Sequence, residues 1–403
     1  SVSELAPIGA GLQVTPNATR LLKSWDVYDQ IAAAEPHTLT VHRYKDGTVL
    51  SHEPQYRSKM YEKYGAPFSD VHRGDLQMAL VKRAQELGVN IVLGQKVVAL
   101  DTSNSSRARI FTEPVGLGGS RVEHVADLIV GADGLWSRCR EFLVGQKDPP
   151  LPTGDLAYRI VLTLDQIKDP KLREIVSNPA VHFWIGPGAH VVSYSMRGGT
   201  MINIVLLVPD DLPENVARQK GSVEEMRKLF VGWDPVLTQF LECVDTVDKW
   251  RLMHRRELDS WINDQGNLVM IGDSCHPMLP YLAQGANSSI EDGAVLGRVL
   301  RHITTRNQLP AALRLFQQLR KKRGEAIVRQ TFKQRDWFHM PDGERQEQRD
   351  QIFMKYLGRE IEGEFPSAWS CPEVQPWLYG YDAEKEVEEA ISKGGFDVGY
   401  ESS

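Results

Sequence analysis

The residue types between Gly272 and Asn287 could bind a phosphorylated ligand. This segment, rich in glycine and proline, follows the apolar run 268–271 and precedes an expected helix. A loop between a buried strand and a helix N-terminus often binds anions, because backbone N–H groups and the helix dipole favour negative charge. Gly285 would let the backbone approach a ligand closely, and Asp273 is placed to accept hydrogen bonds from sugar hydroxyls. The alternative is a purely structural loop before a well-capped helix.

A second loop with the same arrangement lies within residues 127–140. Its short apolar strand ends in Gly131, and the carboxylate of Asp133 comes before another expected helix, which Ser137 would cap. Because Asp133 is followed by glycine, and Asp-Gly is a common turn pair, this segment taken alone indicates only a turn.

Together, the two loops resemble the second and third fingerprints of the single-component, class A flavin-dependent aromatic hydroxylases. The Gly-Ala-Asp-Gly run at 131–134 is similar to the second fingerprint, and residues 272–287 are similar to the third. The Pro-Tyr-Leu-Ala-Gln-Gly-Ala run at 280–286 resembles the salicylate hydroxylase branch in particular. The Trp-Leu-Tyr-Gly-Tyr-Asp run at 377–382 resembles fungal members, so the resemblance covers essentially the whole chain.

The resemblance implies an FAD site and a role in it for single residues. Asp133 would serve flavin and nicotinamide binding, Asp273 would hold the ribityl chain, and the planar guanidinium of Arg73 would reach the phosphate and ribityl region. The backbone at residues 10–11 would pass the adenosine side, and residues 286–287 would lie by the isoalloxazine rim. The expected cofactor-binding residues are Ala10, Gly11, Arg73, Asp133, Asp273, Gly285, Ala286 and Asn287.

Substrate contacts are expected on the strand that contains His190 and Tyr194. Side chains alternate along a strand, so positions 190, 192 and 194 share one face. By resemblance to hydroxylases of hydroxybenzoates and hydroxynicotinate, His190 would take or share a phenol proton and Tyr194 would hydrogen-bond the ring oxygen. Arg159 resembles an arginine that some fungal members use to hold a phenolate. The alternative is a histidine of the sheet that packs beside a tyrosine.

The resemblance further implies an FAD-dependent monooxygenase that hydroxylates a small phenolic or aromatic substrate. NAD(P)H would reduce the FAD, and reduced flavin with O₂ would give a C4a-hydroperoxide that attacks an electron-rich ring. The pocket must exclude water, because the hydroperoxide would otherwise decay to H₂O₂. Two alternatives stay open: a same-fold flavin oxidase or epoxidase acting on a non-phenolic metabolite, and a truncated or degenerate flavoprotein fragment without activity. No metal site is expected.

The first residues depart from the family pattern. The first fingerprint, G-x-G-x-x-G on an opening βαβ unit, is not found, since Gly9-x-Gly11 follows no strand and lacks the third glycine. We therefore expect one βαβ unit of roughly 30–40 residues to precede Ser1. A chain without that unit lacks the glycine turn for the pyrophosphate, which makes FAD retention a question for direct measurement.

Composition and charge narrow the classes of partner. The 403 residues carry 47 Lys and Arg against 53 Asp and Glu, a net charge of −6, which argues against a basic surface for nucleic acid. The longest apolar run, 201–208, is interrupted by Asn203 and falls short of the about 20 residues of a membrane span. Four widely spaced cysteines form no C-x-x-C pair, which favours a reducing, cytoplasmic location. The expected partners are a small aromatic substrate and O₂, and a homodimer is left open.

The order of expected elements indicates an α/β fold. An FAD/NAD(P)-binding, Rossmann-like three-layer domain would contain residues 1–150, including part of the substrate-side sheet, and would return at 263–340. A mostly antiparallel substrate domain would be inserted at 151–262. The return at 263–340 would contain the long helices of a C-terminal helical region, and a charged C-terminal tail would cover 341–403. Particular expectations are a hairpin over 38–44 and 48–52, a helix over 74–87 and a strand over 89–93.

Overall fold

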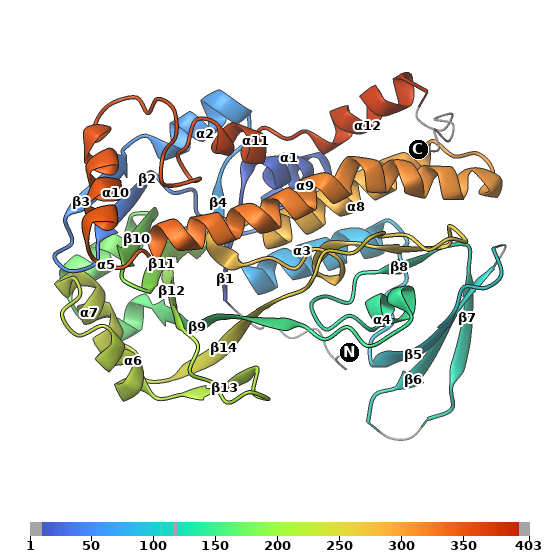
Figure 1. The fold of residues 1–403 in the computed structure, drawn as a ribbon, viewed down its shortest axis with the longest axis horizontal. Coiled ribbons are helices and arrows are strands. Elements are labelled where there is room, and N and C mark those ends of the chain that lie inside the picture. The colour runs from blue at the N-terminus through green and yellow to red at the C-terminus, as the bar shows by residue number, and fades with distance from the viewer. Residues whose placement is uncertain (1–9, 106, 117–118, 395–403) are drawn as a thin grey trace.

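A large sheet, several smaller sheets and a long helix that extends over them make up the computed structural model (Figure 1). It describes residues 10–105, 107–116 and 119–394, so Gly9 of the Gly-x-Gly run lies outside the described residues. The long helix is α9 (Leu309–Phe338). Figure 1 shows it running above both the large sheet and the smaller β-structure at the opposite end of the view.

The large sheet has eight strands in the order β13-β14-β9-β12-β11-β10-β2-β3, and β10 and β2 are the parallel pair within it. The expected hairpin is confirmed, with Leu39 paired to Glu53, and it extends the sheet at one edge. In sheet order the strands are β13 (Arg218–Gly221), β14 (Val247–His254), β9 (Leu151–Thr163), β12 (Met201–Pro209), β11 (Ala189–Met196), β10 (Ala180–Gly186), β2 (Thr38–Arg43) and β3 (Val49–Glu53).

The central strand β12 shows why this sheet can form one wall of a site. Alternate residues of a strand point to opposite faces, and Ile202, Ile204 and Leu206 pack in a core cluster with residues of the surrounding helices. Those helices are α5 (Pro170–Ser177), α6 (Val223–Leu229) and α7 (Pro235–Glu242). The residues between them on the strand, including Asn203 and Val205, line a cavity on the other face.

The two loops singled out in the sequence meet at the ends of a parallel strand pair, β8 (Ile129–Gly131) and β15 (Leu268–Met270). The backbone N of Ile271 donates to the Gly131 carbonyl at 3.0 Å, and Ser274 Oγ donates to the same oxygen at 2.7 Å. Nearby lie α4 (Arg138–Val144) and a three-stranded antiparallel sheet of β5 (Gln95–Asp101), β6 (Ala108–Pro114) and β7 (Val122–Ala126).

A buried ion-pair cluster joins α1 (Pro16–Ser24), α8 (Gly285–Arg301) and α9. Arg320 contacts Glu291 and Asp292, each at 2.7 Å, and Arg323 contacts Glu291 at 2.9 Å. Asn17 of α1 also donates to Glu291, at 2.6 Å. Because a buried charge is costly unless it is paired, this cluster fixes how the three helices pack.

Near the first described residues, β1 (Gly11–Val14) pairs antiparallel with β4 (Ser69–His72), and α2 (Tyr56–Tyr64) precedes β4. The helix expected over 74–87 is α3 (Arg73–Glu86). The strand expected over 89–93 is wrong: this segment is irregular, with Val89 and Val92 exposed. No described strand pairs with it, and an apolar run without a pairing partner cannot satisfy its backbone groups as a strand.

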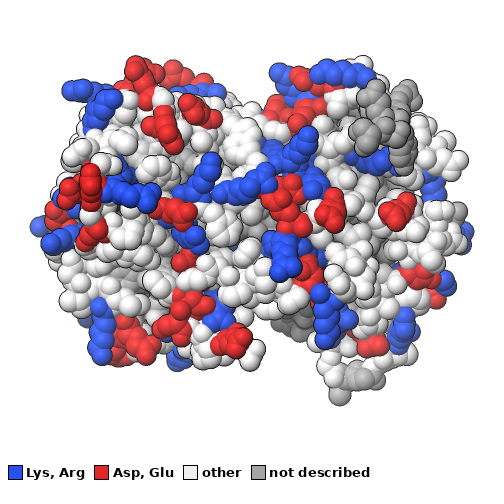
Figure 2. All heavy atoms as spheres, in the orientation of Figure 1, with Lys and Arg blue, Asp and Glu red and all other residues white. Residues whose placement is uncertain are grey.

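In the C-terminal region, α10 (Glu344–Lys355) and α11 (Val374–Tyr379) pack against the large sheet, whereas α12 (Ala383–Ser392) packs against α8. Trp369 and Tyr379 are buried beside Phe68, whereas Trp377 is 40% exposed. No described helix combines the length and the apolar character that a bilayer span requires. Figure 2 shows Lys and Arg interspersed with Asp and Glu on the viewed face.

Candidate active site

A cavity of ≈ 510 Å³ lies between the large sheet, β1, α3 and the start of α8. It brings together residues that are far apart in the sequence, and His190, Val192 and Tyr194 of β11 all line it, as the alternation of the strand predicts. The expected site residues on its wall are Gly11, Arg73, Arg159, His190, Tyr194, Asp273, Gly285 and Ala286.

His190 is 1% exposed, and its Nδ1 lies 2.7 Å from Nε2 of His339, directly after α9. Burial, and next the neighbouring His339, hold the pKa of His190 well below its usual range. The imidazole is therefore neutral at physiological pH and able to accept a hydrogen bond. The rings of Tyr281 and Phe338 pack against it at centroid distances of 5.2 and 5.3 Å, which fixes its orientation.

Asn203 is a site residue that the sequence analysis did not select. Its side chain is fully buried and lines the cavity, and its Oδ1 accepts a hydrogen bond from the Gly11 amide at 2.8 Å. Its Nδ2 has no hydrogen-bond partner among the described residues, which leaves a donor for a ligand. The sequence feature that could have identified this residue is the interruption of the apolar run 201–208 by an asparagine.

Two arginines on the cavity wall form no ion pair with an acidic residue in the described part of the chain, although the charge of Arg73 acts on the nearby Asp273 and opposes the rise of its pKa. Neither the Arg73 nor the Arg159 side chain forms an ion pair or a hydrogen bond with a described residue, although Arg159 lies 5.4 Å from the Trp250 ring centroid. Burial, rather than any acidic neighbour, dominates at Arg159 and lowers its pKa. A cation in low-dielectric surroundings is costly without a counter-charge, so it favours the binding of an anion. The cavity is therefore suited to a phosphate, carboxylate or phenolate group.

The loop before α8 supplies the opposite wall. Asp273 belongs to the turn η4 (Gly272–Ser274) and is open to the cavity, while the surrounding protein raises the pKa of its carboxyl group by desolvation. Gly285 and Ala286 begin α8, whose first turn contains no acidic residue. The Asp273 carboxylate can accept hydrogen bonds from hydroxyl groups, and the start of α8 and the Arg73 guanidinium favour a phosphate. Together these groups suit the ribityl and phosphate groups of FAD.

Three of the expected cofactor residues lie outside the cavity wall. Asn287 is buried, accepts from Thr15 N at 3.1 Å and donates to Gln13 O at 3.0 Å, so it fastens β1 to α8. Asp133 accepts from Arg138 N at 2.7 Å and from Cys139 N at 3.0 Å, and so organises the start of α4. The Ala10 carbonyl accepts from the Arg73 amide at 3.0 Å, which places α3.

Cys275, His276 and Asp292 bring three ligand-type atoms within 4.8 Å of one another. The Asp292 carboxylate is already bonded to His276 Nε2 at 2.6 Å, to Arg320 Nε at 2.7 Å and to the Gly272 amide at 2.8 Å. Burial also raises the pKa of the Cys275 thiol well above its usual range. The Arg320 guanidinium repels a metal cation, and a protonated Cys275 thiol is a poor ligand for one. The cluster therefore supports the loop structurally.

The chain is similar in sequence to FAD-dependent monooxygenases. A family profile described as "FAD binding domain" matches residues 7–331. The FAD-dependent monooxygenase OpS4 of Beauveria bassiana (strain ARSEF 2860) is 49% identical over 393 residues, which cover 96% of this chain and 90% of that protein. The 3-amino-4-hydroxybenzoate 2-monooxygenase PtnB3 of Streptomyces platensis is 31% identical, with coverages of 94% and 88%. The 6-hydroxynicotinate 3-monooxygenase of Pseudomonas fluorescens is 32% identical, with coverages of 81% and 83%.

Solved structures show the same fold. CtdE in complex with FAD and a substrate superposes with a TM-score of 0.79 at 19% identity, covering 98% of this chain and 91% of that one. A salicylate hydroxylase substrate complex superposes with a TM-score of 0.74 at 20% identity, with coverages of 94% and 90%. The mixed α/β fold expected from the sequence is confirmed by these likenesses.

Proposed function

Given that the chain belongs to the class A FAD-dependent hydroxylases, we propose that it hydroxylates a small phenolic ring, with NAD(P)H and O₂ as co-substrates. The observation that carries the proposal is the shared cavity wall of His190, Tyr194 and Arg159. His190 is a neutral imidazole that can accept a proton, Tyr194 offers a hydroxyl group, and Arg159 is a guanidinium without an acidic partner in the described structure. Together they suit a phenolic substrate that gains phenolate character.

FAD would occupy the opposite side of the cavity. Arg73 would contact its phosphates, Asp273 would accept hydrogen bonds from its ribityl hydroxyls, and the backbone of residues 285–286 would face its ring system. When bound, reduced FAD activates O₂ and supplies one oxygen atom to the substrate ring. Because phenolate character enriches the ring in electrons, the protein groups around the phenolic oxygen decide how readily the ring accepts that atom.

The names of the relatives support an acidic or polar aromatic substrate. One relative acts on 3-amino-4-hydroxybenzoate and another on 6-hydroxynicotinate, and a structural neighbour is a salicylate hydroxylase. Each of the three compounds combines a ring hydroxyl with a carboxylate. Arg159 and Arg73 supply positive charge on the cavity wall for such an anion.

The test measures product formation directly. Purified protein is given FAD, NADH or NADPH, and one of three phenols: salicylate, 3-amino-4-hydroxybenzoate or 6-hydroxynicotinate. We expect a flavin absorption spectrum, substrate-stimulated oxidation of the nicotinamide, and one atom from ¹⁸O₂ in the product by mass spectrometry. Benzoate, which lacks the ring hydroxyl, is the matched control and should give H₂O₂ without hydroxylated product. A protein that takes up FAD and hydroxylates none of the three phenols would contradict this function.

A further inference from the structure

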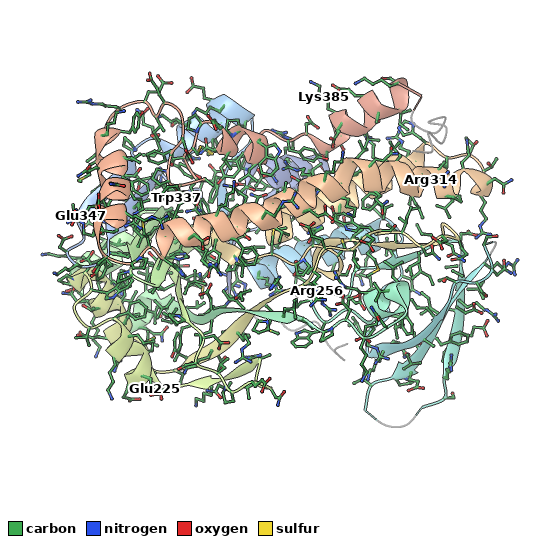
Figure 3. All side chains as sticks on the ribbon, in the orientation of Figure 1. Glu225, Arg256, Arg314, Trp337, Glu347 and Lys385 are labelled. Carbon is green, nitrogen blue, oxygen red and sulfur yellow. The ribbon has the colours of Figure 1, made fainter. Side chains whose placement is uncertain are left out.

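His339 connects the cavity histidine to a carboxylate on a different strand. It follows α9 directly, two residues after Trp337, which Figure 3 labels at that end of the helix. Its Nε2 lies 2.7 Å from Nδ1 of His190, and its Nδ1 lies 4.0 Å from Oδ1 of Asp155 on β9. The His339 carbonyl accepts from the Gly188 amide at 2.9 Å, which fixes this segment against the turn before β11.

Exposure increases along this row of three groups. The His190 side chain is buried, whereas the His339 and Asp155 side chains are 9% and 11% exposed. Asp155 Oδ2 accepts a hydrogen bond from the Tyr281 hydroxyl at 2.7 Å, and the Arg335 guanidinium lies 3.8 Å from the same oxygen. Burial raises the pKa of the Asp155 carboxyl group, and these two neighbours act against that rise. The group faces the Nδ1 side of His339, where its ionised form places a negative charge.

That charge decides the tautomers of both imidazoles. Burial, and next Arg335, lower the pKa of His339 to about 3, so both rings are neutral and each carries one N–H. A carboxylate opposite Nδ1 of His339 favours the proton on that nitrogen, which leaves its Nε2 as an acceptor. His190 must then donate through Nδ1, and its Nε2, which has no partner among the described residues, is left as the proton acceptor.

Burial also explains why His190 needs a second group. An imidazolium enclosed by protein is costly, so a proton that enters at Nε2 is best passed on through Nδ1. His339 is placed to receive it, and Asp155 is the next acceptor outward.

We propose that His339 and Asp155 form a relay that takes the phenol proton from His190 toward solvent, with Asp155 setting the tautomers that the relay requires. The proposal rests on the proposed function. In the forward direction the phenol O–H bond breaks and a bond to His190 Nε2 forms. The Nδ1–H bond of His190 breaks while His339 Nε2 gains a proton, and His339 Nδ1 releases its proton to the Asp155 carboxylate. The oxygen keeps its electron pair as phenolate, and the reverse sequence returns a proton to the product.

The first test needs no substrate. Histidine in the FAD-loaded protein is labelled with ¹⁵N, and long-range ¹H–¹⁵N correlation spectra report which nitrogen of each ring is protonated; His190→Asn and His339→Asn identify the signals. We expect Nδ1–H on both rings. Asp155→Asn should give Nε2–H on His339, while Glu347→Gln, which removes an exposed carboxylate on α10, should change neither ring. Nε2–H on His190 in the unmodified protein would overturn the proposal.

The second test measures turnover with whichever of the three phenols is converted fastest. His339→Gln keeps a hydrogen-bonding group beside His190 but cannot pass a proton, so we expect the kcat for hydroxylated product to fall about 100-fold. The KM should stay near that of the unmodified protein, because His339 does not line the cavity. A His339→Gln enzyme with unchanged kcat would refute the relay. An unmodified enzyme that converts no phenol would instead refute the proposed function, and the tautomer spectra keep the two failures apart.

Discussion

The Gly11 amide donates a hydrogen bond to Oδ1 of Asn203 across 2.8 Å, which joins β1 to the centre of the large sheet. The two residues are 192 positions apart in the sequence and meet at the edge of the cavity. The contact holds the backbone of β1 in place, and Nδ2 of Asn203, which has no partner among the residues that the structure describes, can donate to a ligand. One hydrogen bond therefore connects the expected cofactor side of the cavity with the substrate side.

Gly11→Ala should destabilise the protein and disturb the cavity. A β-carbon at this position would lie 2.5 Å from Tyr194 Cε2 and 2.6 Å from Asn203 Cγ, so buried groups would have to move. We expect the free energy of unfolding to fall by about 1–3 kcal/mol and FAD content to decrease, measured by urea denaturation and flavin absorbance. Gly293→Ala is the control: its β-carbon would meet open space within α8, so stability should be kept or rise. Equal stability of the two variants would contradict the prediction.

Asn203→Leu should lower both stability and turnover. Leucine has a similar size but can neither accept from Gly11 nor donate to a ligand, and it leaves the Gly11 amide unsatisfied, at a cost of about 1–3 kcal/mol. Urea denaturation and the rate of product formation would show the two effects. Ile204→Val, on the opposite face of the same strand, should cost about 0.5–1.5 kcal/mol and keep turnover. If both variants lose turnover equally, the role of Asn203 is only structural.

Arg159→Met should weaken binding of anionic phenols without destabilising the fold. The variant removes a charge that has no acidic partner in the described structure, and its unbranched side chain can still pack beside Trp250. A charge-assisted hydrogen bond is worth about 1.5–3 kcal/mol, so KM should rise about 10- to 100-fold. Arg218, which also lies over the Trp250 ring but is paired with Asp248, gives the control Arg218→Met, with KM expected to be unchanged. A lower melting temperature with unchanged KM would contradict the prediction.

The buried pair of His276 and Asp292 should make stability depend on pH. Burial alone would lower the pKa of His276, but the Asp292 carboxylate outweighs it and the pKa is raised. For Asp292, burial is outweighed by His276 and Arg320, which lower its pKa to about 2. The histidine's contribution is therefore complete below its unfolded pKa of about 6.5 and is lost as pH rises through the folded value.

His276→Gln should accordingly cost about 3–5 kcal/mol at pH 6, because Asp292 loses a buried charged partner. The deficit relative to the unmodified protein should shrink as pH rises above the folded pKa of His276. Urea denaturation of both proteins at several pH values between about 6 and 9 measures this difference. The carboxylate's own contribution should persist down to about pH 4 and disappear toward pH 2. A deficit that is the same at every pH would show that His276 is not charged in the folded protein.

The sequence by itself determined the elements whose signals are local. Apolar strands that end in glycine and are followed by helices identified the two loops near Asp133 and Asp273. Alternation along β11 placed His190 and Tyr194 on one face. It failed for residues 89–93, because pairing depends on a neighbouring strand that local pattern does not report.

Only the tertiary structure decided which polar groups share an environment. Asn203, His339 and Asp155 lie on three separate elements, and each became part of the candidate site through packing with partners far away in the chain. The fold also shows that Asn287 and Asp133 hydrogen-bond to backbone groups, while their cofactor contacts stay a prediction. Periodicity specifies which face of an element is buried, but long-range packing decides which side chains meet there, and so fixes their protonation and their free hydrogen-bonding capacity.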